Sequence, residues 1–421
     1  MTIHFIIATR NNLKYLEWSY YSIREFQGSH EVKLRIADDA SSDETALWLK
    51  TKMRSDSNMK CFVNRSEKRY GLTYLYDELQ KGLLEEDLIL FWHSDMYLTP
   101  NALDALEEIM YTDGQPNYKT IGSLTRIEPP LHPAGPEKII FDAGLEPENF
   151  QKEKLLSFIE SYQFDHETTN GVFAPWACFV KDYREILGHD HLFRPQSKED
   201  SDIWNTFLLN RCKFIQTWKG FVYHLTSRGS RFNPMLTTVG VDSEEWKKQN
   251  KKALLNFVRK WHTYPLHSDT LEPIVKQTFP ITFWCSFTLT YGLIELLEPW
   301  CTYLAMPETE ENKKIREYFI SQEQDERLKE LFERKIVFWN RIDPFVVNVN
   351  FVVEIPKTLT QEDYNIIEHL TEGVSNLKNF AAYTIGGLRI GVGMFQKNTY
   401  AGMLQNVLVN KIKTQEDIEE L

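Results

Sequence analysis

Polar groups follow several apolar runs of the chain, at points where a buried strand would end. The stretch LILFWHSDMYLTP, residues 88–100, is apolar on both sides of His93, Ser94 and Asp95. Carboxylates and imidazoles can bind Mg²⁺ or Mn²⁺, and a divalent cation neutralises charge that develops on phosphate oxygens. The types of these residues therefore suggest metal-assisted chemistry at a strand end.

A second acidic stretch reads Glu199-Asp200-Ser201-Asp202. A carboxylate can act as a general base, and neighbouring acids raise one another's pKa by repulsion. The alternative is an ordinary helix start, where acids favour the positive end of the helix. His224 closes a further apolar strand pattern, and it is either a metal ligand or a hydrogen-bonded core histidine.

The elements that would position these groups alternate between strand and helix patterns. Apolar, β-rich runs cover residues 3–9, 32–37, 60–64 and 87–98, with helical spacing between them. This alternation predicts an α/β fold with a mostly parallel sheet flanked by helices. Because ligands bind beyond the carboxyl ends of parallel strands, we expect Thr9, Asp39 and Asp95 at the mouth of one site.

The order of these motifs along the chain carries a family resemblance. The segments ATRNN, ADDASSDET, HSD, EDSDIW and VYHLTSRGSR occur in the order seen in family 2 glycosyltransferases, which have the Rossmann-like GT-A fold. KEDSDIWNTFLLNR is similar to the acceptor-side motif of the β-1,4-galactosyltransferases. The resemblance covers roughly residues 1–261. It implies a metal-dependent, inverting hexosyl- or pentosyltransferase that moves a sugar from a nucleotide-diphosphate donor, expected to be UDP-linked, to an acceptor hydroxyl by direct displacement.

The resemblance also implies the metal ligands. The family's strand-tip motif is Asp-x-Asp, and its last Asp binds the metal, so Mn²⁺ or Mg²⁺ is expected at Asp95 with His224 as the second ligand. Here His93 replaces the first Asp, and its usual ribose contact would fall to His93 or Ser94. Asp95 could instead cap the helix that follows, although Thr99 fits that role better.

On the donor side, the resemblance implies a wall made of residues that follow the strands: Ala8, Thr9, Arg10, Asn11, Asp39, Arg69, His93, Ser94 and Asp95. Asp39 would accept the N–H of the base, unless it belongs to an ordinary turn. Arg69 would meet the base or the diphosphate, with Arg65 and Lys68 as competitors.

On the acceptor side, Asp200 matches the family's catalytic base, and Glu199 would orient the acceptor. That acceptor could be a glycan, a lipid head group, a protein, a small molecule or a hydroxymethylated DNA base. The last alternative is motivated by a basic cluster formed by Lys247, Lys248, Lys251, Lys252, Arg259 and Lys260, with Arg228 and Arg231 nearby. A solvated helix face would explain the same cluster. A non-catalytic nucleotide-sugar-binding module is a further alternative, whereas the absence of Gly from ATRNNLKY disfavours a nucleotidyltransferase.

The bulk composition narrows the protein class. The 421-residue chain has a formal net charge of -12, which argues against a generic polyanion binder. Its five cysteines show no CxxC spacing, so we expect reduced thiols and a cytoplasmic protein. No signal-peptide pattern or integral membrane segment is expected, and the most apolar stretch, residues 281–297, is predicted to be a buried helix.

We expect three parts along the chain. They are a GT-A domain at 1–232, a helical extension at 233–306, and a C-terminal helix with a small α/β unit at 307–421. The role of the last part is not readable from the sequence, and a homo-oligomer formed through it is one possibility.

Overall fold

The computed structural model describes residues 2–163, 166–226, 228, 242–338, 351–370, 377–378, 381–392 and 399–421. Contacts divide the chain into two compact units, one comprising residues 1–253, 266–274 and 404–421 and the other residues 254–265 and 275–403. These limits differ from the expected boundaries at 232 and 306. The difference arises because a strand before residue 306 pairs with a strand after it in the second unit.

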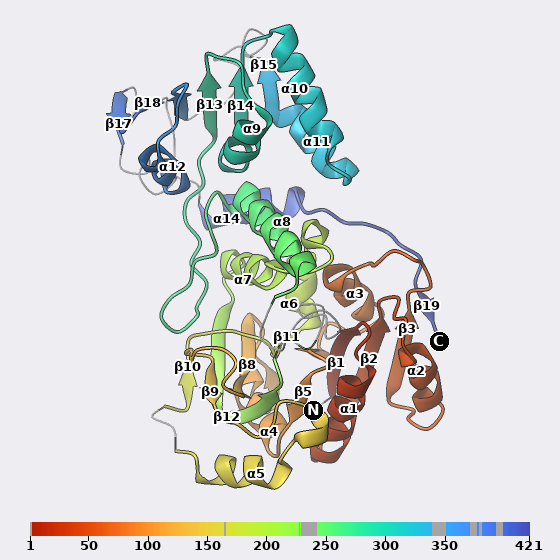
Figure 1. The fold of residues 1–421 in the computed structure, drawn as a ribbon. Helices are drawn as coiled ribbons and strands as arrows, with labels where there is room; N and C mark the ends of the chain where they lie inside the picture. The colour runs from red at the N-terminus through yellow and green to blue at the C-terminus, as the bar shows by residue number, and fades with distance from the viewer. Residues whose placement is uncertain are drawn as a thin grey trace. The chain divides into compact units, whose positions relative to one another are not determined.

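The first unit is built on one mixed sheet with the strand order β10-β12-β8-β11-β4-β1-β2-β3-β19 (Figure 1). Its strands are β1 (Thr2–Thr9), β2 (Glu31–Asp38), β3 (Met59–Val63), β4 (Leu88–Trp92), β5 (Met96–Leu98), β8 (Thr120–Glu128), β9 (Lys138–Ile140), β10 (Thr168–Thr169), β11 (Trp176–Phe179), β12 (Lys213–His224) and β19 (Glu419–Glu420). A separate hairpin joins β6 (Tyr111–Thr112) and β7 (Gln115–Pro116). Strands β4, β1, β2 and β3 are parallel, as are β12, β8 and β9, and β11 runs antiparallel between the two groups. The predicted α/β fold is confirmed.

Helices flank this sheet. They are α1 (Leu13–Phe26), α2 (Thr45–Met53), α3 (Leu72–Leu79), α4 (Ala102–Met110), α5 (Lys152–Ser161), α6 (Val180–Glu185) and α7 (Glu199–Leu209), with short 3-10 turns η1 (Pro147–Asn149) and η2 (His191–Phe193). Helix α3 packs on β1 and β2, α2 on β3, and α4 on β8 and β12. Helix α8 (Glu244–Trp261) continues from the first unit into the second.

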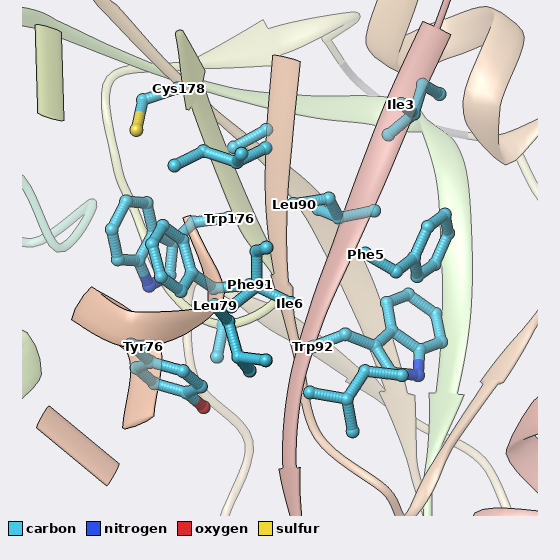
Figure 2. Packing of buried hydrophobic residues seen from close by; sticks show 14 of the residues in the cluster. Ile3, Phe5, Ile6, Tyr76, Leu79, Leu90, Phe91, Trp92, Trp176 and Cys178 are labelled. Atoms are coloured by element: carbon cyan, nitrogen blue, oxygen red, sulfur yellow. The ribbon is translucent and has the colours of Figure 1, made fainter. Parts of the chain in front are cut away.

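The core of the first unit centres on β1 and β4, whose side chains are almost all buried. Phe91 stacks on Trp176 with ring centroids 4.1 Å apart, and Phe5 meets Trp92 edge-on at 5.2 Å (Figure 2). The Trp92 indole donates to Ser19 Oγ in α1 at 2.8 Å. Such aromatic pairs add about 0.5–1.5 kcal/mol beyond their buried area, so β4 is held firmly up to the residue before His93.

Strand pairing brings polar residues that are distant in the sequence together where neighbouring strands of this sheet end. Strand β4 ends at Trp92, and after a turn β5 pairs antiparallel with β12, which places Met96 opposite His224. At the neighbouring strand end, the Asp39 amide donates to the Thr9 carbonyl at 2.9 Å. The residues singled out in the sequence therefore follow adjacent strands.

The last residues of the chain, 411–421, form a C-terminal segment that belongs to the first unit. β19 pairs with the edge strand β3, and the Leu421 amide donates to the Cys61 carbonyl at 2.9 Å. The hydroxyl groups of Tyr70 and Tyr74 donate to backbone carbonyls of this segment at 2.9 and 2.6 Å. The segment thus covers an edge that would otherwise be open.

One partly buried carboxylate, whose side chain is 13% exposed, anchors this segment. Asp77 accepts hydrogen bonds from the Tyr183 hydroxyl at 2.6 Å, the His189 amide at 3.0 Å and His191 Nε2 at 2.9 Å, and it also bonds Lys413 Nζ. Burial alone would raise the pKa of Asp77, but these partners hold it well below its ordinary value. Asp77 is therefore charged and fully paired.

The second unit contains a smaller sheet with the order β15-β14-β13-β16-β18-β17. Its elements are β13 (Ile281–Cys285), α9 (Tyr291–Leu297), η3 (Glu298–Trp300), β14 (Tyr303–Met306), α10 (Glu310–Ser321), α11 (Glu326–Lys335), β15 (Ile336–Phe338), β16 (Phe351–Ile355), α12 (Gln361–Glu368), β17 (Ala382–Ile385) and β18 (Leu388–Val392), and α14 (Tyr400–Val409) leads back to the first unit. The buried Glu298 bonds Arg259 and Lys335, both at 2.8 Å.

The expectation of one buried helix over residues 281–297 is wrong. The segment forms β13, a connection and α9, because an apolar run alone does not distinguish a buried strand from a buried helix. The small α/β unit expected at the C-terminal end therefore begins well before residue 307. Among the described residues, no helix combines the length and apolarity needed to cross a bilayer.

We predict that Asp77→Ala lowers the free energy of unfolding by about 3 kcal/mol, because it leaves several buried donors without an acceptor. Urea unfolding followed by circular dichroism measures this. Glu420→Ala is the matched control, since it removes an exposed ion pair with Lys60 and should cost less than about 1 kcal/mol. Equal costs for the two variants would contradict the anchoring role of Asp77.

Candidate active site

A cavity of about 560 Å³ lies at the strand ends of the first unit. Its lining includes Ala8, Thr9, Arg10, Asp39, Arg69, His93, Ser94, Asp95, Glu199, Asp200 and His224, which are all but one of the predicted site residues. The exception is Asn11, which is exposed and whose Oδ1 accepts from the Ser42 amide at 2.7 Å. Its neighbour Asn12 lines the cavity instead and donates to Ser94 Oγ at 2.9 Å.

His93, Asp95 and His224 form a potential metal site. One donor atom from each lies within 4.8 Å of the other two. The turn between β4 and β5 supplies the first two residues, and the pairing of β5 with β12 brings His224 beside them. The structure thus adds His93, expected at the ribose, to the two predicted metal ligands.

Asp95 is buried and bonded from two sides. His224 Nε2 lies 3.4 Å from Oδ1, and the Arg228 amide donates to Oδ2 at 3.1 Å. Burial alone would raise the pKa of Asp95, but His224 and His93 lower it to well below its ordinary value. Asp95 does not cap a helix, and neither does Thr99, whose hydroxyl donates to the Phe221 carbonyl at 2.6 Å.

The two histidines differ in their charge preferences. Burial lowers the pKa of His93 to about 4, so this imidazole is neutral near pH 7. Burial also lowers the pKa of His224, but Asp95 and Glu128 outweigh that effect, and the net shift is upward. His224 Nδ1 lies 2.7 Å from Glu128 Oε1, so its hydrogen points there and Nε2 faces Asp95.

At the other end of the cavity, Asp39 holds the loop after β3. Its Oδ1 accepts from the Tyr70 amide at 2.7 Å and Asn64 Nδ2 at 3.1 Å, and its Oδ2 accepts from the Gly71 amide at 3.0 Å. Since a carboxylate oxygen has two lone pairs, only Oδ2 keeps room for another donor. Arg69 Nε lies 3.5 Å from that atom.

Two arginines share this end. Burial lowers the pKa of Arg69, and the positive charge of Arg10 acts in the same direction. Arg10 Nε and Thr9 Oγ1 are buried without a hydrogen-bond partner in the described part of the chain. Two close cations and unpaired polar atoms suit an anionic, hydrogen-bonding ligand.

The acidic pair at the start of α7 forms the third wall. Burial raises the pKa of Asp200 to about 6, while a hydrogen bond from Trp176 opposes this shift. Burial and the nearby charge of Asp200 raise the pKa of Glu199 to about 8. At pH 7, Asp200 is therefore mostly ionised and Glu199 mostly protonated, and only the former can accept a proton.

Several residues that line the cavity are not predicted by the sequence motifs. Arg126, Glu128 and Lys138 come from β8 and β9, and Phe173, Trp204 and Trp246 supply aromatic surface. Glu128 is the last residue of a buried strand and Asp95 closely follows one, so the same sequence signal could have identified Glu128.

Comparisons with known proteins give little. No protein-family model and no curated protein matches the sequence. Similar solved structures include GalNAc-T7 with UDP, GalNAc and Mn²⁺, with 15% identity and a TM-score of 0.42 over 62% of this chain and 47% of that one. Staphylococcus aureus TarS 1-349 in complex with UDP-GlcNAc shares 15% identity with a TM-score of 0.35 over 61% and 67%, and S. aureus TarS shares 18% with 0.36 over 53% and 36%. The chain thus spans less than half of GalNAc-T7, and a shared activity does not follow from such scores.

The donor set of the potential metal site fits a divalent transition metal. One carboxylate and two imidazoles converge, and the distal nitrogen of His224 is bonded to a carboxylate, as is usual for metal-bound histidine. Mg²⁺ prefers oxygen ligands and keeps its water, so two imidazoles suit it poorly.

We predict that Mn²⁺ binds about tenfold or more tightly than Mg²⁺, as measured by isothermal titration calorimetry. His93→Asp replaces a nitrogen donor by oxygen and should reduce this ratio. His30→Gln is the control, because His30 lies in a second His–Asp–Glu group outside the cavity lining. A ratio unchanged by His93→Asp, or lowered by His30→Gln, would argue against the proposed donor set.

Proposed function

We propose that the chain is a metal-dependent glycosyltransferase that uses a nucleotide-diphosphate sugar, with UDP as the expected nucleotide. One observation carries this proposal: a single cavity holds a cationic end, a potential metal site and an ionised carboxylate next to a protonated one. The cationic end and the potential metal site suit the nucleotide and the diphosphate of the donor, and the two carboxyl groups suit the acceptor.

The donor would lie along the strand ends. Strands β2, β1 and β4 are neighbours, so Asp39, Thr9 and His93 follow one another along this edge. With strands roughly 4.8 Å apart, the outer two of these positions are separated by about 10 Å, which suits a nucleoside. The base would donate to Asp39 Oδ2, and Arg10 and Arg69 would offset phosphate charge.

The leaving diphosphate would point toward His93, Asp95 and His224. A divalent cation bound there supplies compensation for the charge that grows on the leaving oxygens. Neighbouring protein groups would fix that position, because the Arg228 backbone amide holds Asp95 and the Glu128 side chain holds His224.

Asp200 would remove the proton of the acceptor hydroxyl as its oxygen attacks the anomeric carbon. The new C–O bond forms on the face opposite the leaving group, so a single displacement inverts the anomeric centre. Glu199 keeps its proton at pH 7 and would donate a hydrogen bond to the acceptor rather than compete for the same proton. Trp176 orients Asp200 through its indole N–H.

A DNA-base acceptor is less well supported. Arg228 contacts Glu146 at 3.2 Å, and Arg259 is paired with Glu298, so neither is available to a phosphate backbone. Lys247 is paired with Glu244 at 2.7 Å, and both residues lie on an exposed face of helix α8. Arg231 lies outside the described residues. Glycans, lipid head groups, proteins and small molecules stay open as acceptors. A cytoplasmic location, a homo-oligomer and the assignment of the N-terminal part to the GT-A fold stay predictions.

We predict that a UDP-sugar raises the melting temperature only when Mn²⁺ is also present. A ligand that binds the folded state alone must stabilise it. Thermal-shift measurements with UDP-, GDP-, CMP- and dTDP-sugars, with and without Mn²⁺, make the comparison. No shift with any donor would remove the transferase hypothesis and the binding-module alternative together.

We predict that Asp200→Asn lowers the transfer rate by at least about 100-fold while the donor affinity changes less than about threefold. Glu199→Gln is the matched variant and should lower the transfer rate much less, because the native Glu199 side chain is already neutral at pH 7. The wild-type rate should rise about tenfold from pH 5 to pH 7 as Asp200 loses its proton, given its pKa of about 6. Unchanged transfer by Asp200→Asn would favour another base.

A further inference from the structure

A network of buried charged side chains adjoins the potential metal site. Glu128, at the end of β8, is 1% exposed and has three partners. It accepts hydrogen bonds from His224 Nδ1 at 2.7 Å and Lys138 Nζ at 2.9 Å, and it forms an ion pair with Arg126 Nη1 at 3.0 Å. Strand pairing fixes this arrangement, because Arg126 stands opposite Lys138 in the β8–β9 register.

The other charged residues of this network hold Glu128 in place. Arg126 is 5% exposed, its guanidinium lies 3.9 Å from the centre of the Phe173 ring, and its Nη2 donates to Glu137 at 2.9 Å. A buried ionic network adds little stability over a well-packed apolar one of the same size. Its position next to three potential metal ligands calls for another explanation.

The hydrogen bond between Glu128 and His224 decides which ring nitrogen is available. Glu128 is a carboxylate and can only accept, so His224 must carry a hydrogen on Nδ1. The remaining nitrogen, Nε2, then faces Asp95 at 3.4 Å and lies in the cluster with His93. Without Glu128, either nitrogen could carry the hydrogen, and the ring could turn away from the cluster.

We propose that Glu128 is a positioning residue that orients His224 for metal binding, and that Arg126 and Lys138 fix Glu128 in that role. The proposal rests on the proposed function, since it assumes that His224 binds the metal. It adds a residue that acts on the metal through another side chain rather than by contact.

The test is a double-mutant cycle on the affinity for Mn²⁺ alone, measured by electron paramagnetic resonance of free Mn²⁺. Glu128→Gln should weaken binding by 10- to 100-fold, the range found when a partner of a metal-bound histidine is removed. In a His224→Ala background, Glu128→Gln should have no further effect, because the residue acts through His224. Equal effects in both backgrounds would overturn the positioning role and indicate general electrostatics.

Glu137→Gln is the matched control. Glu137 contacts Arg126 but not His224 in the described structure, so this variant should change Mn²⁺ affinity less than about threefold. Circular dichroism and the melting temperature report folding, and Glu128→Asp replaces Glu128→Gln in the cycle if the latter does not fold.

Two failures are distinguishable. Wild-type protein that retains no Mn²⁺ would overturn the metal part of the proposed function and this role with it. Wild-type protein that binds Mn²⁺, together with a folded Glu128→Gln variant of unchanged affinity, would overturn the positioning role alone.

Discussion

The dehydration of Asp95 is the constraint around which the site is arranged. A carboxylate that is only 5% exposed loses most of its water, and the protein must replace it with donors and positive charge. The backbone of residue 228 and the imidazole of His224 do so, and His224 in turn needs Glu128 on its far side. Each partner comes from a different strand, because Asp95 follows β4, His224 ends β12 and Glu128 ends β8. The geometry of the site therefore depends on the pairing of several strands of the sheet.

The same burial gives the acidic pair of α7 different proton affinities. Glu199 and Asp200 are adjacent in the chain, yet Trp176 supports the charge on only one of them. Two identical functional groups can thereby hold opposite protonation states at one pH, which is how a site provides both a donor and an acceptor of protons. The stacking of Trp176 on Phe91 ties this distinction to the central core.

Much of this arrangement could be predicted from the sequence because strand ends are visible there. Asp39, Asp95 and His224 each close an apolar run, and the parallel fold brings such ends together. Glu128 and its partners were missed because β9 is short and its pairing with β8 leaves no pattern in the sequence. The side chain of Asn11 was misplaced relative to Asn12, since a backbone with φ of 52° turns the loop at that residue. The stretch 281–297 was assigned to the wrong element, because its strand-helix division depends on partners more than 50 residues away.

The return of the chain to the first unit at residues 404–421 has a consequence for biosynthesis. Residues 404–421 complete the unit that residues 1–253 begin, and nearly the whole second unit is translated between them. While that insert leaves the ribosome, the edge of β3 and the partly buried Asp77 lack their final partners. The nascent first unit must therefore persist in an unfinished, edge-exposed form for the time needed to synthesise about 150 residues, several seconds to half a minute at cellular rates. An unpaired strand edge of this kind is prone to pair with other chains until the last residues arrive.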